Sequence, residues 1–465
     1  SEMCIETGLR ELYKVETLDT RFTPKEPGPL PKAQKSQWNT PEYYLYYLVF
    51  LTIPVLMFKS VYDVSQPSHP TYKQYEYLLE PGWIPGRKVD NSDAQYRGFR
   101  ENLPVMAVIL VLHPLLRRVW ERFSGNGGDG QASANGGIKG EAQPEQRAEA
   151  RMKSRTRFDL AFAAIFLLAL HGISALKVLA ILSINYKIAT GLPRQHVTLA
   201  IWVFNVGILF ANELCRGYPL AGVASLILPS TTTNADPKAE VEMGWGAWLD
   251  TYGGLLPRWE VLFNITVLKM IAFNFDYLWS LDRRASSPIE DVIPLIHALP
   301  LQQQMLHLTN ALQKKNLTPT QYTEKDRIRH GAPTSTFTYA NYLAYTLYSP
   351  LYLIGPVINF NDYIHQTSYP LPYLTLSRIA PYALRFILCV ITMELCLHNL
   401  YAVAISKAHP DWTQYTPFQL SMLGYFNLHI IWLKLLIPWR LFRLWALCDG
   451  IDAPENMVRC MSDNY

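Results

Sequence analysis

The stretch YANYLAYTLYSPLYLIGPVINFNDY, residues 339–363, is the part of the sequence that predicts most about the fold. It begins with an uncharged run, Tyr342 to Ile354, which Gly355 and Pro356 then interrupt. A polar exit follows at Asn359, Asn361 and Asp362. Backbone groups freed inside a bilayer need protein or water as partners, so one interpretation is a re-entrant segment that faces the protein interior. The alternative is a kinked helix that ends at the membrane surface.

The composition indicates a membrane protein rather than a soluble domain. Of the 465 residues, 49% are hydrophobic and 17% are charged, against roughly 25% charged residues in an average soluble domain. The net charge of +4 gives no electrostatic footprint for nucleic acid. The 6 cysteines form no C-x-x-C pair, so neither a zinc site nor a disulfide framework is predicted. We therefore predict an all-α, polytopic membrane protein.

Apolar runs that are long enough, or nearly long enough, to cross a bilayer recur along the chain. The predicted spans are Tyr43–Phe58, Leu103–Leu116, Leu160–Ile184, Thr198–Ala211, Val261–Leu281, Tyr382–Ala404 and Phe418–Leu447. Together with the stretch 339–363 they give about eight spans or re-entrant segments of a helical bundle. Residues Pro294–Leu312 have the amphipathic pattern of a helix that lies on the bilayer or on the bundle.

Composition also predicts how the chain is divided. A polar segment covers residues 1–42, and the first two membrane segments with their polar loop cover 43–116. Residues 117–158 are basic and Gly-rich, lack apolar groups that could offset the entropy of ordering, and are predicted to be a disordered loop. We expect residues 124–150 to be dispensable for assembly. Residues 159–465 form the predicted helical core.

The pair Glu394 and His398 is the strongest candidate for acid–base chemistry. The spacing of four places both side chains on one face of the span 382–404. A carboxylate can orient an imidazole and raise its basicity, as a general base requires. The alternative, which we favour, is a structural hydrogen-bonded pair, because polar groups buried in lipid need partners regardless of function.

Arg440 and Arg443 are candidates for substrate binding at the end of the last span. Guanidinium groups match phosphate oxygens, so a lipid headgroup or coenzyme A is one possible ligand. The alternative is a positively charged helix end held at the membrane surface. Asn359, Asn361 and Asp362 are further substrate-binding candidates. The sequence contains no metal-ligand spacing and no phosphate-binding glycine loop, and we predict no metal.

Four stretches resemble one protein family. They are GWIPGRKVDNSDAQYRGFR (82–100), LYSPLYLIGPVINFNDY (347–363), HNLYAVAISKAHPDW (398–412) and LKLLIPWRLFRLWALCDGIDAPENMVRCMSDNY (433–465). These stretches resemble the fungal glycerol-uptake proteins of the membrane-bound O-acyltransferase superfamily, which also contains Hedgehog acyltransferase. The resemblance covers most of the chain apart from residues 1–40 and 124–157.

The resemblance implies an enzyme of the endoplasmic reticulum membrane, with the plasma membrane as an alternative location. It implies transfer of a long acyl chain from acyl-coenzyme A, the co-substrate, to a lipid hydroxyl such as that of a lyso-glycosylphosphatidylinositol (lyso-GPI) anchor. In the family, stretch 433–465 continues into a W-H-R-S-Y-N segment and later a spanning catalytic histidine. This sequence ends at Tyr465, so we expect a fragment that is inactive alone. No residue inherits the base by motif, and His398 and Glu394 remain the candidates.

Two other classes of function stay open at this point. Intramembrane Asp276, Glu394 and His398 are residue types that relay protons, as a glycerol–proton symporter requires. The absence of a visible internal repeat in the sequence counts against that alternative. A noncatalytic membrane scaffold is the third possibility.

Overall fold

The computed structural model describes residues 38–124, 144–227, 245–256, 258–282, 319–329 and 331–455. Described secondary structure is helical apart from one antiparallel pair, β1 (Glu80–Pro81) and β2 (Lys88–Val89), with Glu80 opposite Val89. Six of the described helices are long and apolar enough to cross a membrane. They are α2 (Pro41–Val64), α4 (Ala94–Phe123), α7 (Arg194–Leu214), α10 (Trp259–Asp282), α16 (Leu376–Asn399) and α18 (Pro417–Cys448). The predicted all-α, multi-span fold is confirmed.

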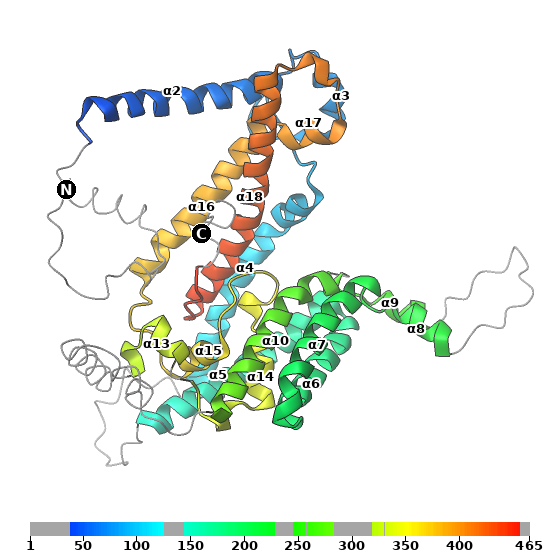
Figure 1. Ribbon diagram of the computed structural model, residues 1–465, viewed down its shortest axis with the longest axis vertical. Helices are drawn as coiled ribbons and strands as arrows, with labels where there is room; N and C mark the ends of the chain where they lie inside the picture. Colours follow the sequence, from blue (N-terminus) through cyan, green and yellow to red (C-terminus); the bar gives the residue numbers. More distant parts are fainter. Residues whose placement is uncertain are drawn as a thin grey trace, which may run out of the picture. The chain divides into compact units, whose positions relative to one another are not determined.

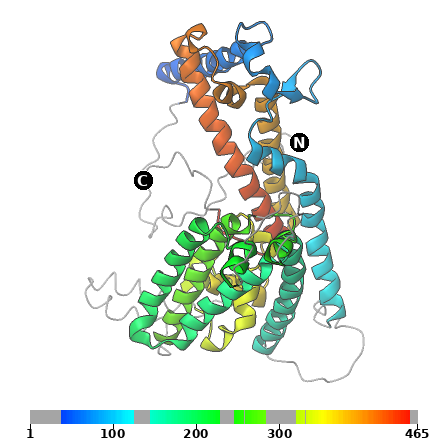
Figure 2. The ribbon, with the colours of Figure 1, turned by 90° about the vertical axis from the view of Figure 1, so that its right-hand side faces the viewer.

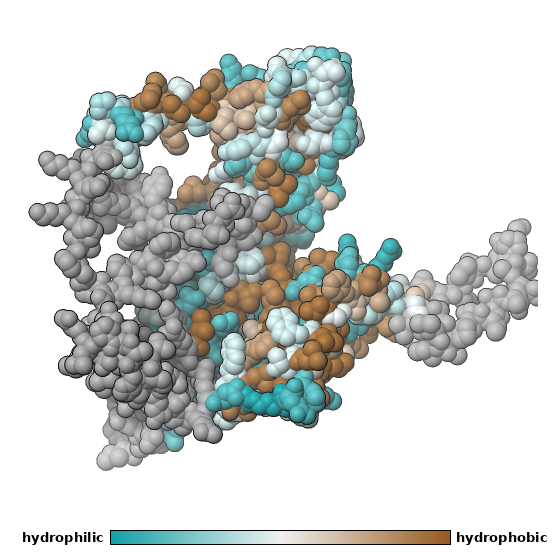
Figure 3. Space-filling model, in the orientation of Figure 1, coloured by the Kyte–Doolittle hydropathy of each residue, from teal (hydrophilic) through white to brown (hydrophobic). Residues whose placement is uncertain are grey.

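The chain forms two compact units, which are described separately. Unit 1 contains residues 1–109, 376–444 and 455–465, so it brings together segments from both ends of the chain. Besides α2, α16 and the first parts of α4 and α18, it holds α3 (Tyr72–Tyr75), η1 (Glu76–Leu78), α17 (Ala402–Ala408) and η5 (Trp412–Gln414). Most apolar side chains of α2 are exposed, and Figure 3 shows this helix largely in brown. Such a surface suits contact with lipid.

Unit 2 contains residues 110–375 and 445–454. Its longer helices are α5 (Pro144–His171), α6 (Ser174–Gly191), α7 and α10, and α6, α7 and α10 lie side by side in Figures 1 and 2. The shorter elements are α8 (Leu220–Ile227), α9 (Trp245–Asp250), η2 (Pro319–Gln321), α13 (Glu324–Arg329), η3 (Thr334–Thr336), α14 (Tyr339–Thr346), η4 (Ser349–Leu351) and α15 (Phe360–Ser368).

Aromatic rings fill the core of unit 2. The ring of Phe273 on α10 lies 4.5 Å from that of Tyr342 and 4.8 Å from that of Phe360, measured between centroids. All three side chains are fully buried. The stretch 339–363 therefore supplies α14, η4 and the start of α15 to the centre of this unit, around which α5, α6 and α10 pack.

The opening stretch differs from its predicted form in one respect. α14 ends at Thr346 rather than continuing to Ile354, because Pro350 disfavours helical backbone at Ser349 and lacks an N–H to continue the helix. Gly355 has φ +143°, and both it and Pro356 are buried, so the break faces protein as the re-entrant interpretation requires. Its predicted closeness to Glu394, His398, Arg440 and Arg443 involves the other unit and stays a prediction.

The predicted span Leu160–Ile184 is two helices, which is a correction to the sequence analysis. α5 ends at His171 and α6 begins at Ser174, with Gly172 at φ +51° between them. The backbone of residues 252–256 packs against this break, since Ile173 N donates to Tyr252 O at 3.0 Å. A side chain at residue 172 would occupy the space of that carbonyl. The close backbone approach explains the break.

Three other boundaries also differ. The predicted loop 117–158 is shorter at both ends, because α4 continues to Phe123 and α5 begins at Pro144, a residue type suited to the first helical turn. Residues 125–143 lie outside the described residues, as does the predicted amphipathic helix 294–312. The span predicted to end at Ala404 ends at Asn399, and α17 follows.

Asparagine side chains join three helices of unit 2 within the apolar bundle. Asn185 Nδ2 donates to Asn274 Oδ1 at 3.1 Å, and Asn274 Nδ2 returns a bond to Asn185 Oδ1 at 2.9 Å. Asn205 Nδ2 also donates to Asn185 Oδ1, and Asn185 Nδ2 contacts the Tyr342 hydroxyl at 2.9 Å. Amide pairs of this kind hold transmembrane helices together.

Asn185→Ala is expected to lower stability by about 2 kcal/mol, because it leaves Asn205, Asn274 and Tyr342 with fewer partners. The measurement is the melting temperature of the purified protein in detergent. The control is Lys187→Ala two residues later, where the side chain is exposed. Equal melting temperatures for the two variants would contradict a stabilising role of the amide cluster.

Candidate functional site

Asp449 lies where the last long helix ends, and the local sequence explains its position. Gly450 follows at φ +83°, Gly450 N donates to Leu447 O at 3.0 Å, and Ile451 N donates to Ala446 O at 2.9 Å. These two bonds form a Schellman motif, which requires a left-handed residue and is commonly completed by glycine. The motif ends α18 at Cys448 and turns the Asp449 carboxylate into the interior of unit 2, where it is fully buried.

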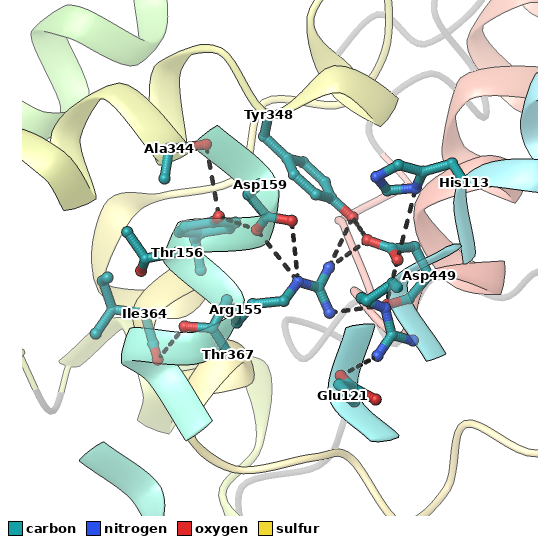
Figure 4. Close-up of polar contacts among 12 residues, drawn as sticks. His113, Glu121, Arg155, Thr156, Asp159, Ala344, Tyr348, Ile364, Thr367 and Asp449 are labelled. Carbon is teal, nitrogen blue, oxygen red and sulfur yellow. Dashed lines mark hydrogen bonds and ion pairs between the residues drawn. The ribbon is translucent and has the colours of Figure 1, made fainter. Parts of the chain in front are cut away.

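Two arginines and a tyrosine donate to this carboxylate (Figure 4). Arg117 Nε lies 2.7 Å from Asp449 Oδ1, and the Tyr348 hydroxyl lies 2.5 Å from Oδ2. Arg155 Nη2 also donates to Oδ2, while its Nη1 donates to the Asp449 carbonyl at 3.2 Å. Burial favours the neutral acid, but Arg155 and Arg117 outweigh it and hold the pKa of Asp449 below its usual range. Asp449 is therefore ionised.

A second buried carboxylate shares Arg155. Arg155 Nε donates to both oxygens of Asp159, one turn later on α5, at 3.1 Å, and the Tyr363 hydroxyl donates to Asp159 Oδ2 at 2.7 Å. Burial raises the pKa of Asp159 to about 6, with Arg155 opposing the shift. One guanidinium thus bridges two carboxylates that come from α5 and from the end of α18.

His113 lies beside Asp449 in its neutral form. Its Nδ1 lies 3.2 Å from Trp445 Nε1 and 3.6 Å from Asp449 Oδ1. An indole N–H can only donate, so the shorter contact makes Nδ1 an acceptor and places the imidazole proton on Nε2. His113, Asp159 and Asp449 offer ligand atoms within 4.8 Å of one another. Because Arg155, Arg117 and the tyrosine hydroxyls already donate to these carboxylate oxygens, a cation would have to displace them.

The cluster joins several segments around two carboxylates rather than presenting a reactive group. Its donors and acceptors are directed at one another, and Arg117 also donates through Nη1 to Glu121 Oε1 at 2.5 Å. We define Arg117, Arg155, Asp159, Tyr348 and Asp449 as the Asp449 cluster. It fixes the end of α18 against α4, α5 and the stretch 339–363, and so sets where the chain emerges after residue 449.

The predicted site residues Asn359, Asn361 and Asp362 lie at the start of α15. Asp362 Oδ1 accepts from Arg327 Nε at 2.5 Å and from Gln366 Nε2 at 2.9 Å, and the ion pair is buried. Asn361 Oδ1 accepts from Ala332 N at 3.0 Å. Asn359 is the residue before the first turn of the helix. Asn361 and Asp362 therefore have protein partners, and their role toward a substrate stays a prediction.

Glu394 and His398 lie in unit 1 on one face of α16, but His398 Nδ1 is 3.8 Å from Glu394 Oε2, too far for the predicted side-chain hydrogen bond. Arg100 donates to Glu394 through Nε at 2.6 Å and through Nη2 at 2.8 Å, and Trp83 Nε1 donates to Glu394 Oε2 at 2.9 Å. His398 is fully buried, with Nδ1 2.7 Å from Glu394 O and Nε2 3.3 Å from Trp83 N. Both ring nitrogens have backbone partners, which favours the structural interpretation.

His398→Ala is expected to weaken assembly of unit 1, because it leaves Trp83 N without its acceptor and opens a space beside the ring of Trp83, whose centroid is 5.0 Å away. We expect a loss of about 2–3 kcal/mol in stability. Thermal stability and acyl transfer by the full-length gene product should be measured together. A variant as stable as the wild type but without activity would instead assign His398 to the chemistry.

Arg440 and Arg443 have separate environments in unit 1. Arg443 Nη1 donates to Glu455 Oε2 at 3.1 Å, and its guanidinium lies 4.8 Å from the ring centroid of Tyr382. Arg440 Nη1 lies 3.4 Å from Cys389 Sγ, and Arg440 Nε is buried with no partner among the described residues. Arg443 is thus held by an acid and an aromatic ring, whereas Arg440 keeps a free donor.

Sequence reasoning missed Arg155, Asp159 and Tyr348. The signal available was the four-residue spacing of Arg155 and Asp159 in RTRFD, an arrangement that forms ion pairs on a helix. The predicted disordered loop 117–158 contains Arg155, and this prediction is incompatible with a helical ion pair between Arg155 and Asp159. Two further histidines lie on apolar runs of the sequence: His171 is buried and contacts the Tyr352 hydroxyl at 3.1 Å, whereas His429 is exposed.

The observed features define an all-α membrane protein whose core contains polar groups at depth. Comparison with protein families matches residues 254–465 to the membrane-bound O-acyltransferase family. Membrane-bound O-acyltransferase GUP1 of Saccharomyces cerevisiae is 37% identical over 462 residues, which cover 98% of this chain and 70% of the relative. The GUP1 protein of Candida tropicalis is 38% identical, covering 99% and 68%, and gup1 of Schizosaccharomyces pombe is 35% identical, covering 93% and 64%.

The chain belongs to the membrane-bound O-acyltransferase family. The relatives' names state O-acyl transfer, and the resemblance predicted from the four stretches is confirmed.

Proposed function

We propose that this protein takes part in transfer of a long acyl chain from acyl-coenzyme A to a lipid hydroxyl, with a lyso-GPI anchor in the endoplasmic reticulum membrane as acceptor. The observation that carries the proposal is identity of 37% across nearly the whole chain to a protein named as a membrane-bound O-acyltransferase. Six helices that are long and apolar enough to cross a bilayer support the proposal, because a long acyl chain and a lipid acceptor both reside in a membrane.

The reaction forms a C–O bond between the acceptor hydroxyl and the acyl carbon while the thioester C–S bond breaks. The hydroxyl proton passes to a general base and then to the leaving thiolate of coenzyme A.

In unit 1, Arg440 is the predicted substrate-binding residue that keeps an unpartnered N–H, so we propose that it contacts a substrate phosphate. Arg440→Ala should then raise the KM for the phosphate-bearing substrate more than it lowers kcat.

The test uses membranes from cells that express the full-length gene, compared with cells that lack it. Labelled palmitoyl-coenzyme A is supplied with lyso-GPI, with lysophosphatidylcholine or with glycerol, and the acylated product and released coenzyme A are measured. We expect gene-dependent acylation of lyso-GPI. Gene-dependent acylation of another acceptor alone would reject the GPI assignment, and glycerol uptake into vesicles without any acyl transfer would favour the symporter.

A further inference from the structure

A pocket of about 420 Å³ lies in unit 2 where two spans end, and charged side chains line it: Glu213, Arg216, Arg258 and Glu260. α7 ends at Leu214 and α10 begins at Trp259, so the pocket lies at one end of two neighbouring helices that are long enough to cross a membrane. We refer to it as the α7–α10 pocket. Figure 1 shows these two ends close to α9.

The chain that forms the rim is strained. Arg216, Gly217 and Tyr218 have φ values of 49°, 72° and 54°, so three successive residues are left-handed and two of them are not glycine. Each costs about 1–2 kcal/mol relative to ordinary backbone. Two bonds hold the turn, because the Gly217 carbonyl accepts from Trp259 Nε1 at 3.2 Å and from Lys177 Nζ at 3.4 Å. Strain maintained in this way is found preferentially at binding sites.

Two of the four charged groups pair with each other, and the other two have no partner among the described residues. Arg258 Nε donates to Glu260 Oε1 at 3.1 Å, yet the Arg258 side chain is 72% exposed, which leaves its two Nη groups available. Within the described part of the chain, Glu213 and Arg216 have no ion-pair or hydrogen-bond partner through their side chains, and both are exposed. The pocket therefore offers two guanidinium groups and one free carboxylate.

These groups match a ligand that carries a phosphate and a primary ammonium. Guanidinium groups favour phosphate, and the N-terminus of α10, at Trp259, adds the positive end of a helix dipole. The free Glu213 carboxylate suits an ammonium that can donate hydrogen bonds. Among the described lining residues, two arginines and two glutamates give no net charge, which favours a zwitterion over an anion.

The location at the ends of two spans identifies the source of such a group as a membrane lipid. Aromatic residues adjoin the pocket residues in the sequence: the rings of Tyr218 and Trp259 are 6.4 Å apart, and Trp248 and Tyr252, in α9 and just after it, are exposed. Tryptophan and tyrosine concentrate at the depth of lipid headgroups. We propose that the α7–α10 pocket binds the headgroup of a phosphoethanolamine lipid. The proposal goes beyond acyl transfer and does not depend on it.

Lipid binding to the full-length protein in detergent, measured by native mass spectrometry, tests the proposal. The probes are short-chain phosphatidylethanolamine, phosphatidylcholine, phosphatidylglycerol, and soluble phosphoethanolamine. Wild type should bind phosphatidylethanolamine about tenfold more tightly than either other lipid. Equal or tighter binding of phosphatidylglycerol would overturn the zwitterion assignment. Binding of soluble phosphoethanolamine without binding of the lipid would overturn the membrane source.

Variants test recognition of the phosphate and of the ammonium separately. Arg216→Gln combined with Arg258→Gln should weaken phosphatidylethanolamine binding by about tenfold or more. Glu213→Gln should lower the affinity of the protein for phosphatidylethanolamine to its affinity for phosphatidylcholine. Arg157→Ala, an exposed arginine on α5 that lies outside this pocket, is the matched control and should bind as wild type does. All four positions are exposed, but Arg258→Gln removes the ion-pair partner of the buried Glu260 and should lower the melting temperature of the double variant. Arg216→Gln alone should leave the melting temperature unchanged and still weaken binding, and binding by the double variant equal to the control would reject the pocket.

Discussion

Asp449→Ala is expected to destabilise the protein by about 3–5 kcal/mol, because it removes one acid from between two arginines in a dry interior. Arg155 is 8% exposed and Arg117 is 13% exposed at the side chain, so water cannot replace the lost carboxylate. Arg155 keeps Asp159 and, through Nη1, the backbone carbonyl of residue 449, but its Nη2 group loses the carboxylate oxygen to which it donated. The fraction of monodisperse protein after heating, measured by size-exclusion chromatography, should fall sharply.

The control is Glu149→Ala on the same helix as Arg155. Glu149 Oε1 lies 2.6 Å from Lys153 Nζ, and both side chains are more than half exposed. A surface pair of this type contributes about 0.3–0.5 kcal/mol, so the melting temperature should barely change. Similar losses for Asp449→Ala and Glu149→Ala would show that water reaches the Asp449 cluster.

A double-mutant cycle tests whether the loss comes from the unpaired arginine. The cycle compares Arg155→Met, Asp449→Leu and the two combined. The double variant removes one buried pair, and replacement of a buried pair by apolar residues is often close to neutral, although Asp159 and Arg117 each lose a partner as well. We expect the double variant to be more stable than the sum of the single losses predicts, with a coupling of about 1–3 kcal/mol. Additive losses would assign the effect to packing.

The spans and the Gly355–Pro356 break were predictable because they depend on hydropathy and on local backbone chemistry, whereas the sequence left open whether the break faces protein or ends at the membrane surface. α7 and α10 appear close to their predicted bounds for this reason. The Asp449 cluster was not predictable in full. Asp449 and Arg155 are 294 residues apart, and nothing in either local sequence specifies the partner.

The helix break at Gly172 was also not predictable from the local sequence, although the segment that causes it is nearer along the chain. The run 160–184 is mostly apolar, with Lys177 as its one charged residue, and a single glycine inside such a run is tolerated in helices. What ends α5 is the approach of the backbone at Tyr252 and Gly254, about eighty residues later along the chain. Tertiary packing decided the boundary, whereas hydropathy set only the apolar character of both helices.

Gly172→Ala is expected to cost on the order of 3 kcal/mol or more, because two penalties add at one position. A Cβ at residue 172 would lie 1.9 Å from Tyr252 O and 2.8 Å from Gly254 N, and neither is a flexible side chain that can move away. The φ of +51° adds the strain of a left-handed alanine. The melting temperature in detergent should fall by many degrees.

Two other glycines separate the two penalties. Gly86 has φ +76° with no atom near the position of a Cβ, so Gly86→Ala should show the backbone strain alone, about 1–2 kcal/mol. Gly207 is helical, exposed and equally open, so Gly207→Ala should be neutral or stabilising by up to about 1 kcal/mol. Because only residue 172 carries the clash as well, its loss should exceed that at residue 86. Equal losses at the two positions would mean that the backbone of residues 252–254 can move away, and the packing that separates α5 from α6 would then be weaker than the contacts indicate.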